Sequence, residues 1–277
     1  MNLSLSNMLG GGSLTLDPDA RAYIAAVETA DGQALEPAIR TAYDQFIRGC
    51  KADGIWDAIK ASCILSGARS LSGALVPLKG SAPTNNNFVS GDYVRTTGLL
   101  GDGTTKFLNS NRANNADPQN NSHNAVWATT IGTGIAIASI ITQNGANQIG
   151  LLGTRNRNLT AQTGITMQTG LCSIARSNSA NYNYRVGGIN NLFVQVSETA
   201  SANNVMILAD GSLAFGSHRI AFYSIGESLD LAALDARLAT LTTRLRFSIT
   251  TGEDWRNYDP DTIAYAVKLL ESGITYA

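Results

Sequence analysis

Between residues 85 and 224 the sequence loses helical periodicity, and this change constrains the fold more than any other feature of the chain. Short apolar runs alternate there with loops rich in Asn, Gly, Ser and Thr, at spacings of about eight to fifteen residues. Such spacing is typical of antiparallel sheets joined by tight turns and indicates a mainly β fold, a β-sandwich. The predicted strands are Tyr93–Thr96, Lys106–Leu108, Ala125–Thr130, Ile135–Ile141, Ile149–Leu152, Ile165–Gln168, Cys172–Arg176, Leu192–Val196 and Ile220–Ser224.

The residues before the β region have a helical pattern. Asp17-Pro18-Asp19 places a capping Asp before Pro at the first helical position, Pro37 opens a second helix, and a third is expected after Asp53. Each helix has one apolar face that requires a partner surface. The three predicted stripes are Tyr23, Ile24 and Val27; then Leu35, Ile39, Tyr43, Phe46 and Ile47; then Ile55, Trp56, Ile59 and Cys63.

After Gly226 the helical period returns. Ser228 can cap a helix, and five leucines follow at spacings of three, four, three and four residues. Two heptads are too few to hold a coiled coil alone, so two interpretations stay open: the leucines pack on the chain's own sandwich, or they lie at a subunit axis as an oligomer interface. The leucines are Leu231, Leu234, Leu238, Leu241 and Leu245.

The charge composition argues against nucleic acid as a partner. Lys and Arg number 20 and Asp and Glu 21, and charged residues make up 15% of the chain, against roughly 25% in ordinary soluble domains. A protein that binds phosphate backbones would show clustered Lys and Arg. The sequence also shows neither a long apolar run that would span a membrane nor a basic start typical of a signal peptide, so we expect a protein made in a reducing cytoplasm.

The residues that could bind metal are few and scattered. Cys50, Cys63 and Cys172 form no CxxC pair, and we predict that they are small buried apolar residues. His123 and His218 are the only histidines, which leaves almost no material for a metal site or a Ser-His-Asp relay. We therefore predict no metal site and no cofactor.

Carboxylates are also scarce in the β region, where Asp92, Asp102, Asp117, Glu198 and Asp210 mostly fall in turn signals. Glycoside cleavage requires two positioned carboxyl groups, and the sequence has no close Glu pair. We predict no catalytic residue. Among the functions considered for this chain, an enzyme that cleaves polysaccharides, a depolymerase, is therefore the least favoured.

The Asn-rich loop at residues 109–124 has the densest group of side chains that both donate and accept hydrogen bonds. Sugar sites combine planar amides, an acid and an aromatic platform. The same residues are also ordinary turn formers, and both interpretations stay open. The candidate glycan-binding residues are Asn114, Asn115, Asp117, His123, Trp127, Tyr182 and Tyr184.

Three stretches carry a more specific signal: GLLGDGTTKFL at 98–108, NNADPQN at 114–120 and RIAFYSIGESLD at 219–230. They resemble bacteriophage virion proteins with a concanavalin A-like (LamG-like) jelly roll, over roughly residues 17 to 246. In that family the segment ADGIWDAIK at 52–60 leads into the sandwich. The resemblance implies a part of the particle surface, such as a tail fibre, a tail appendage or a capsid decoration.

The laminarinase relatives of this fold carry a Glu-x-Asp-x-x-Glu strand motif that the sequence lacks, which favours a binding or structural jelly roll. No legume-lectin calcium site is recognisable. The predicted segments are an extended arm at 1–16, a helical segment at 17–70, the jelly roll at 85–226, the leucine helix at 227–250 and a tail with a short helix at 251–277. Asp259-Pro260-Asp261 in this tail repeats the first helix start.

We therefore predict a virion structural protein that assembles as a homo-oligomer, a trimer, and docks on capsid or tail proteins. Glycines at 10–12 let the arm reach a partner, and its docking residues are Leu3, Leu5, Met8 and Leu9. The alternative is a lectin-like protein that binds host-surface glycans.

Overall fold

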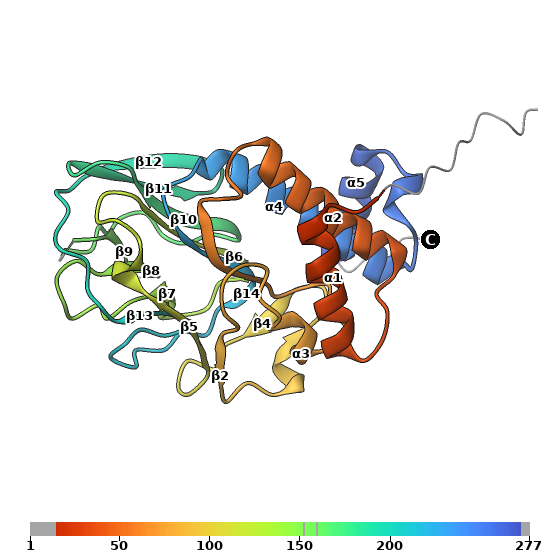
Figure 1. Ribbon diagram of the computed structural model, residues 1–277, viewed down its shortest axis with the longest axis horizontal. Helices are drawn as coiled ribbons and strands as arrows, with labels where there is room; N and C mark the ends of the chain where they lie inside the picture. The colour runs from red at the N-terminus through yellow and green to blue at the C-terminus, as the bar shows by residue number, and fades with distance from the viewer. Residues whose placement is uncertain (1–14, 152, 159, 273–277) are drawn as a thin grey trace, which may run out of the picture.

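Two antiparallel sheets face each other, and helices cover the outer face of the larger sheet (Figure 1). The computed structural model describes residues 15–151, 153–158 and 160–272. The docking residues of the predicted arm, Leu3, Leu5, Met8 and Leu9, lie outside the described residues. The predicted fold class, a mainly β jelly-roll sandwich with helical segments before and after it, is confirmed.

The larger sheet has eight strands. In spatial order they are β12 (Ile189–Val194), β11 (Asn181–Val186), β10 (Gly170–Arg176), β6 (Ser122–Thr130), β14 (Arg219–Gly226), β4 (Gly98–Leu100) and β3 (Tyr93–Val94), and β1 (Ile59–Ile64) also pairs with β14. The smaller sheet has six: β2 (Thr84–Asn86), β5 (Phe107–Ala113), β13 (Asn204–Ile207), β7 (Ile135–Ala138), β8 (Asn147–Gly150) and β9 (Gly153–Asn156).

The central strands of the larger sheet are buried on both faces. Successive side chains of a strand point to opposite faces, so Cys172 and Tyr223 enter the core between the sheets while Leu171 and Phe222 enter the core beneath the helices. The protein therefore has three layers and two hydrophobic cores that share one sheet.

The principal helices are α1 (Pro18–Asp31), α2 (Pro37–Ala52), α4 (Leu231–Thr251) and α5 (Pro260–Glu271), with a single turn, α3 (Leu71–Ala74), beside the sandwich. The two Asp-Pro-Asp starts are confirmed as helix starts. Asp17 accepts a hydrogen bond from the amide of Asp19, and Asp259 accepts one from the amide of Thr262.

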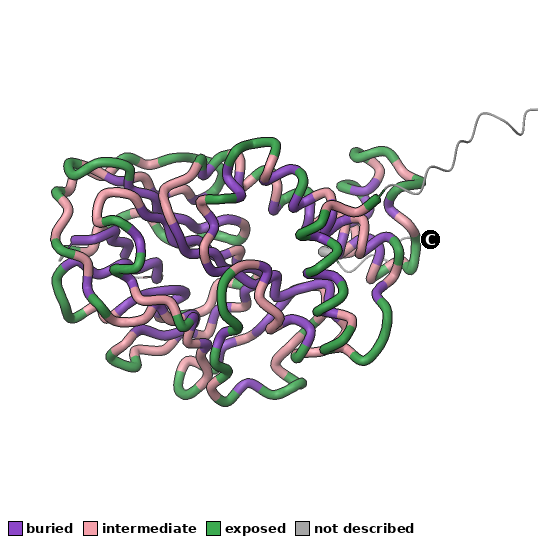
Figure 2. Tube along the Cα trace, in the orientation of Figure 1, coloured by how far each residue is buried: buried purple, intermediate pink, exposed green. Residues whose placement is uncertain are grey.

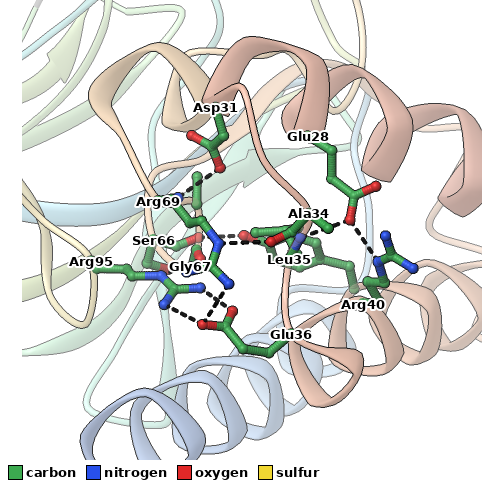
Figure 3. A network of polar contacts seen from close by, with 12 residues as sticks. Glu28, Asp31, Ala34, Leu35, Glu36, Arg40, Ser66, Gly67, Arg69 and Arg95 are labelled. Carbon is green, nitrogen blue, oxygen red and sulfur yellow. Dashed lines mark hydrogen bonds and ion pairs between the residues drawn. The ribbon is translucent and has the colours of Figure 1, made fainter.

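A network of ion pairs joins the α1–α2 connection to the sandwich (Figure 3). Glu36 binds the guanidinium groups of Arg69, at 3.0 Å, and Arg95, while Arg95 Nε donates to the carbonyl of Gly67 at 2.8 Å. Asp31 accepts from the amide of Arg69 at 2.7 Å. The hydrogen bond from Arg95 lowers the pKa of Glu36 despite partial burial, so the pair stays charged at neutral pH.

The leucine helix packs inside its own chain. All five seam leucines are buried, and they belong to the core that α2 and the larger sheet share. The prediction of an oligomer interface at Leu231, Leu234, Leu238, Leu241 and Leu245 is therefore wrong, and the alternative, packing on the chain's own sandwich, is confirmed.

The third predicted helix is wrong. Residues 59–64 form β1, and Cys63 lies opposite Tyr223 in an antiparallel pair with β14. Ile59 and Ile64 face the helical core while Ala61 and Cys63 face the inter-sheet core. A short apolar run buried on both faces cannot be distinguished from a buried helix by periodicity, and its strand partner lies far along the chain.

Most predicted strands are present with shifted ends, but Ile165–Gln168 is irregular. Met167 is nevertheless buried in the inter-sheet core, which explains the apolar run without a ladder partner. The prediction that Cys50, Cys63 and Cys172 are buried free thiols is confirmed. Within the described ranges, none of the helices combines the length and apolar character that a bilayer crossing requires.

We expect Leu238→Ala to lower the free energy of unfolding by about 2–5 kcal/mol, because it removes a fully buried side chain from the helical core. Urea unfolding measures this loss. Tyr265→Ala, at a side chain that is 61% exposed, is the control and should change stability by less than about 0.5 kcal/mol. A Leu238→Ala protein of unchanged stability and altered oligomeric mass would contradict the internal packing.

Candidate functional site

A groove of about 620 Å³ lies on the outer face of the larger sheet, between β6, the start of β10 and the α4 and α5 helices. Seven of its twelve lining residues are threonines, and Trp127 is the one aromatic residue among the twelve. The groove combines a flat apolar ring with many hydroxyl groups, which is the chemistry of a site for a polyhydroxylated ligand.

The strand β6 positions the aromatic ring. Val126 points into the inter-sheet core, so its neighbour Trp127 points to the opposite face, toward the helices. Trp127 packs only partly against the helical core and leaves part of its side chain in the groove.

The threonine hydroxyls fall into two sets. Thr129 Oγ1 donates to the carbonyl of Thr97 at 2.5 Å, and Thr242 Oγ1 donates to the carbonyl of Leu238 at 2.8 Å, so these two hydroxyls stabilise the walls. The hydroxyls with no protein hydrogen-bond partner among the described residues belong to Thr96, Thr97, Thr130, Thr169 and Thr243. These five are available to a ligand.

The ionisable lining of the groove is Arg246 alone among the described residues that form it. A wall of hydroxyls and one guanidinium can donate and accept hydrogen bonds, but it offers no carboxyl pair for general acid and base chemistry. The groups that line the groove can form hydrogen bonds with a polar molecule.

The Asn-rich loop at residues 109–124 has a mainly structural arrangement. Arg112 forms a two-pronged ion pair with the buried carboxylate of Asp117. Asn114 is buried, and its Nδ2 donates to the carbonyl of Gly145 at 2.9 Å and to Ser201 Oγ at 3.0 Å. The prediction that Asn114 and Asp117 contact a glycan is wrong, because both side chains are buried and bonded within the fold. Asn115 is exposed.

His123 is also buried, and its predicted role as a glycan contact is wrong. Its Nδ1 lies 2.6 Å from the carbonyl oxygen of Glu227, and its Nε2 lies 2.7 Å from Ser224 Oγ. Burial lowers the pKa of His123 to about 4, although the hydrogen bond to the Glu227 carbonyl acts in the opposite direction. A neutral His123 therefore joins β6 to β14.

The prediction that Tyr182 and Tyr184 form an aromatic surface for a glycan is wrong as well. Tyr182 and Tyr184 are 1% and 0% exposed, and both lie in the inter-sheet core. Tyr182 donates its hydroxyl hydrogen to the carbonyl of Thr154 at 3.0 Å, so the ring and its polar end are both used inside the fold. Of the seven candidate residues, only Trp127 lines the groove.

The threonines of the groove were missed by sequence reasoning. They come from the segment after β3, from β6, from the residue before β10 and from α4, which lie up to about 150 residues apart in the chain. Individually each is an ordinary polar residue. The alternation of apolar and polar residues along β6 was the one signal that could have indicated an outward Trp127 beside Thr129.

Two arginines are enclosed at one end of the sandwich. Arg176 Nε and Nη2 donate to the carbonyl of Asn156 at 2.9 and 2.7 Å, and Arg157 Nη1 donates to the carbonyl of Asp117 at 3.2 Å. Burial lowers the pKa of Arg157 to about 10 while Asp117 opposes the shift, so the group stays protonated at neutral pH. These arginines therefore join the end of β9 and the loop at Asp117 to their neighbours inside the fold.

The sandwich carboxylates have structural partners too. Asp92 binds Lys106 at 2.6 Å, and Glu198 Oε2 accepts from the amide of Gly145 at 3.1 Å. Burial acts to raise the pKa of Asp102, but hydrogen bonds from the Thr105 side chain and from nearby backbone amides outweigh it and lower the pKa. The described residues contain no cluster of three or more His, Cys, Asp or Glu side chains that could hold a metal ion.

Comparison with known proteins gives no family. No family model matches the chain, and no curated protein matches it. Several solved structures match the chain at low similarity. One is domain 4 of AbnA, a GH43 extracellular arabinanase from Geobacillus stearothermophilus, solved with arabinotriose, with 10% identity and a TM-score of 0.36 over 57% of this chain and 82% of that domain.

Two further structures are Trypanosoma rangeli sialidases, one a mutant with trans-sialidase activity and one in complex with 2,3-difluorosialic acid. Their identities are 9% and 12%, with TM-scores of 0.38 over 73% of this chain. The matched region spans 39% of either sialidase chain. Similarity at this level gives no basis for transferring an activity.

We expect the protein to lose stability as the pH falls from 6.5 to about 4, because of His123. The pKa of His123 is lower in the folded state than in the unfolded state. Between pH 6.5 and about 4 the unfolded state therefore binds a proton that the folded state does not, and this binding favours unfolding. The contribution is complete above pH 6.5, and its loss amounts to roughly 3 kcal/mol. Urea unfolding at pH 7 and pH 4.5 measures it.

The control for this measurement is His123→Gln, which removes the titrating group. His218 titrates in the same direction, since burial lowers its pKa too, so the difference between the two proteins isolates His123. Equal pH slopes in the wild type and His123→Gln would show that His123 is not the source.

Proposed function

We propose that this chain is a structural protein of a bacteriophage particle, displayed on the particle surface as a tail fibre, tail appendage or capsid decoration. It acts by assembly and docking rather than by breaking bonds. One observation carries the proposal: the first and the third of the stretches that resemble phage virion proteins lie far apart in the sequence and pair with each other in the fold.

The meeting point is β14. Arg219 and Ile220 of the third stretch pair with Leu100 and Leu99 of the first. At the other end of β14, the amide of Ser228 donates to Asn121 Oδ1 at 2.8 Å, directly after the second stretch. The resemblance therefore follows the framework of the sandwich, which is the part of a protein that determines its shape.

The helices also fit a display role. Residues of α1, α2, α4 and α5 share one hydrophobic core with the outer face of the larger sheet, so the helices and the sandwich form one packed body. A unit of this kind can present a fixed surface on a particle. Since the seam leucines lie inside this core, contacts between copies must use other surfaces.

The proposal is tested on particles of the phage that encodes the chain. We expect purified particles to contain the protein by mass spectrometry, at a constant number of copies per major capsid protein. Gold-labelled antibodies raised against the full chain should bind intact particles in electron micrographs. A protein found in infected cells and absent from gradient-purified particles would overturn the proposal.

A second function is supported by the groove. Trp127 and the five free threonine hydroxyls provide a ring and hydrogen-bonding groups in one cavity of about 620 Å³, which is large enough for a short oligosaccharide. We propose that the groove binds a host-surface glycan, so that the protein serves particle attachment. The lectin-like alternative then uses Trp127 without the Asn-rich loop.

We expect Thr169→Arg, which fills the groove from an exposed position, to weaken glycan binding by at least about tenfold. Trp127→Leu should have a similar effect by removing the ring. A glycan array identifies the ligand, and calorimetry measures the affinity. Thr104→Arg, at an exposed threonine outside the groove, is the matched control and should bind as the wild type does. Binding that survives Thr169→Arg would place the ligand elsewhere.

A further inference from the structure

The outer strand of the larger sheet carries an unusual concentration of exposed apolar side chains. Four of the eight large apolar side chains exposed on the described surface lie on β12 or directly after it. They are Ile189, Leu192, Val194 and Val196, which are 64%, 59%, 79% and 71% exposed. Figure 2 shows exposed and intermediate residues alternating along this edge.

The strand register gives this surface its direction. Tyr182 and Phe193 lie opposite each other on the core side of the β11–β12 hairpin. Leu192 and Val194 lie opposite Asn183 and Asn181, and they therefore face away from the core.

The helices do not cover this face. The α4 helix reaches the hairpin through the ion pair between Asp235 and Arg185 of β11, at 2.8 Å. One strand further out, the side chains of Leu192 and Val194 are exposed. The exposed apolar strip formed by Leu192 and Val194 therefore begins where the layer of helices ends.

The backbone of β12 is also open. Among the described strands, β12 pairs with β11 alone, so its outer row of amide and carbonyl groups has no ladder partner within the described part of the sheet. Natural edge strands are usually short, charged or interrupted by proline. The six residues of β12, INNLFV, include no charge and no proline.

The other sheet edges among the described strands are short or covered. The free side of β1 is bridged, because the amide of Ser62 donates to the carbonyl of Lys79 at 3.1 Å. The edge strands β2 and β3 have three and two residues. The edge strand β9 is covered, because Thr154 exchanges backbone hydrogen bonds with Gln162 at 2.9 and 2.7 Å. The bare edge of β12 is therefore a specific feature and not a general property of this sandwich.

We propose that β12 pairs antiparallel with β12 of a second copy of this chain, about a two-fold axis, so that the two larger sheets become continuous. A second copy of the chain is the partner that fits this edge, because the edge matches its own copy when the two are related by a two-fold axis. A two-fold axis places each residue against the same strip of the partner, which is favourable when the strip is uncharged and apolar. The nearest cation on this hairpin, Arg185, is already neutralised by Asp235, so no like charges oppose the contact.

An oppositely charged partner would find nothing on β12 to recognise, because the strand carries only apolar and amide side chains. The edge of β12 supplies the backbone hydrogen bonds of a second copy, and its outward side chains supply the apolar contacts. The pairing does not depend on the virion role and should form in the purified full chain.

The experiment measures the mass of the full chain by light scattering after size exclusion. We expect a dimer, twice the 29.2 kDa chain mass. The double variant Leu192→Lys/Val194→Lys should weaken dimerisation by at least a factor of about one hundred, because it places like charges across the axis. Val89→Lys, at an exposed valine that is 60% accessible and outside β12, should leave the dimer intact.

Hydrogen exchange separates pairing from unfolding. The amides of β12 that point away from β11 should exchange slowly in the wild-type dimer and at least about tenfold faster in the double lysine variant. Residues 170–176 of β10 should keep their protection in both proteins. A monomeric wild type, a trimer, or a dimer that persists with both lysines would overturn the proposal.

Discussion

The antiparallel pairing of β14 with β6, β4 and β1 is the contact on which the remaining structure depends. This strand is buried on both faces, with Phe222 toward the helices and Tyr223 toward the smaller sheet. Two hydrophobic cores therefore meet at a single strand. The helices could not pack as they do without the sheet, and the sheet would expose its outer apolar face without the helices.

The polar interior follows from the same arrangement. Two sheets joined by long loops leave backbone carbonyls in the interior at strand ends and in loops, and buried polar side chains supply their hydrogen bonds. Arg176 binds the carbonyl of Asn156, Asn114 binds that of Gly145, and His123 binds that of Glu227. Most of the residues that suggested a sugar site in the sequence, such as Asn114, His123 and Tyr182, form hydrogen bonds inside the fold instead. The groove described above has a different composition. It is lined mainly by threonines and lies on the face of the larger sheet that the helices partly cover.

The sequence predicted what local patterns determine. The loss of helical period marked the sandwich, Asp17 and Asp259 marked helix starts, and the heptad leucines marked α4. It did not predict what depends on distant partners: β1 resembles a helix until it is paired with β14, and the aromatic Tyr182 resembles a platform until the second sheet covers it. The groove has the same origin, since its walls come from segments that meet only in the folded chain.

The pairing of β1 with β14 also has a consequence for biosynthesis. Cys63 and Tyr223 are 160 residues apart in the chain, and their side chains are in contact at 3.4 Å. A ribosome that adds about 5–20 residues per second delivers the second strand roughly 8–30 seconds after the first. During that interval the apolar β1 has emerged without the strand it pairs with. The topology therefore leaves an apolar strand exposed during synthesis and makes its pairing a late step of folding.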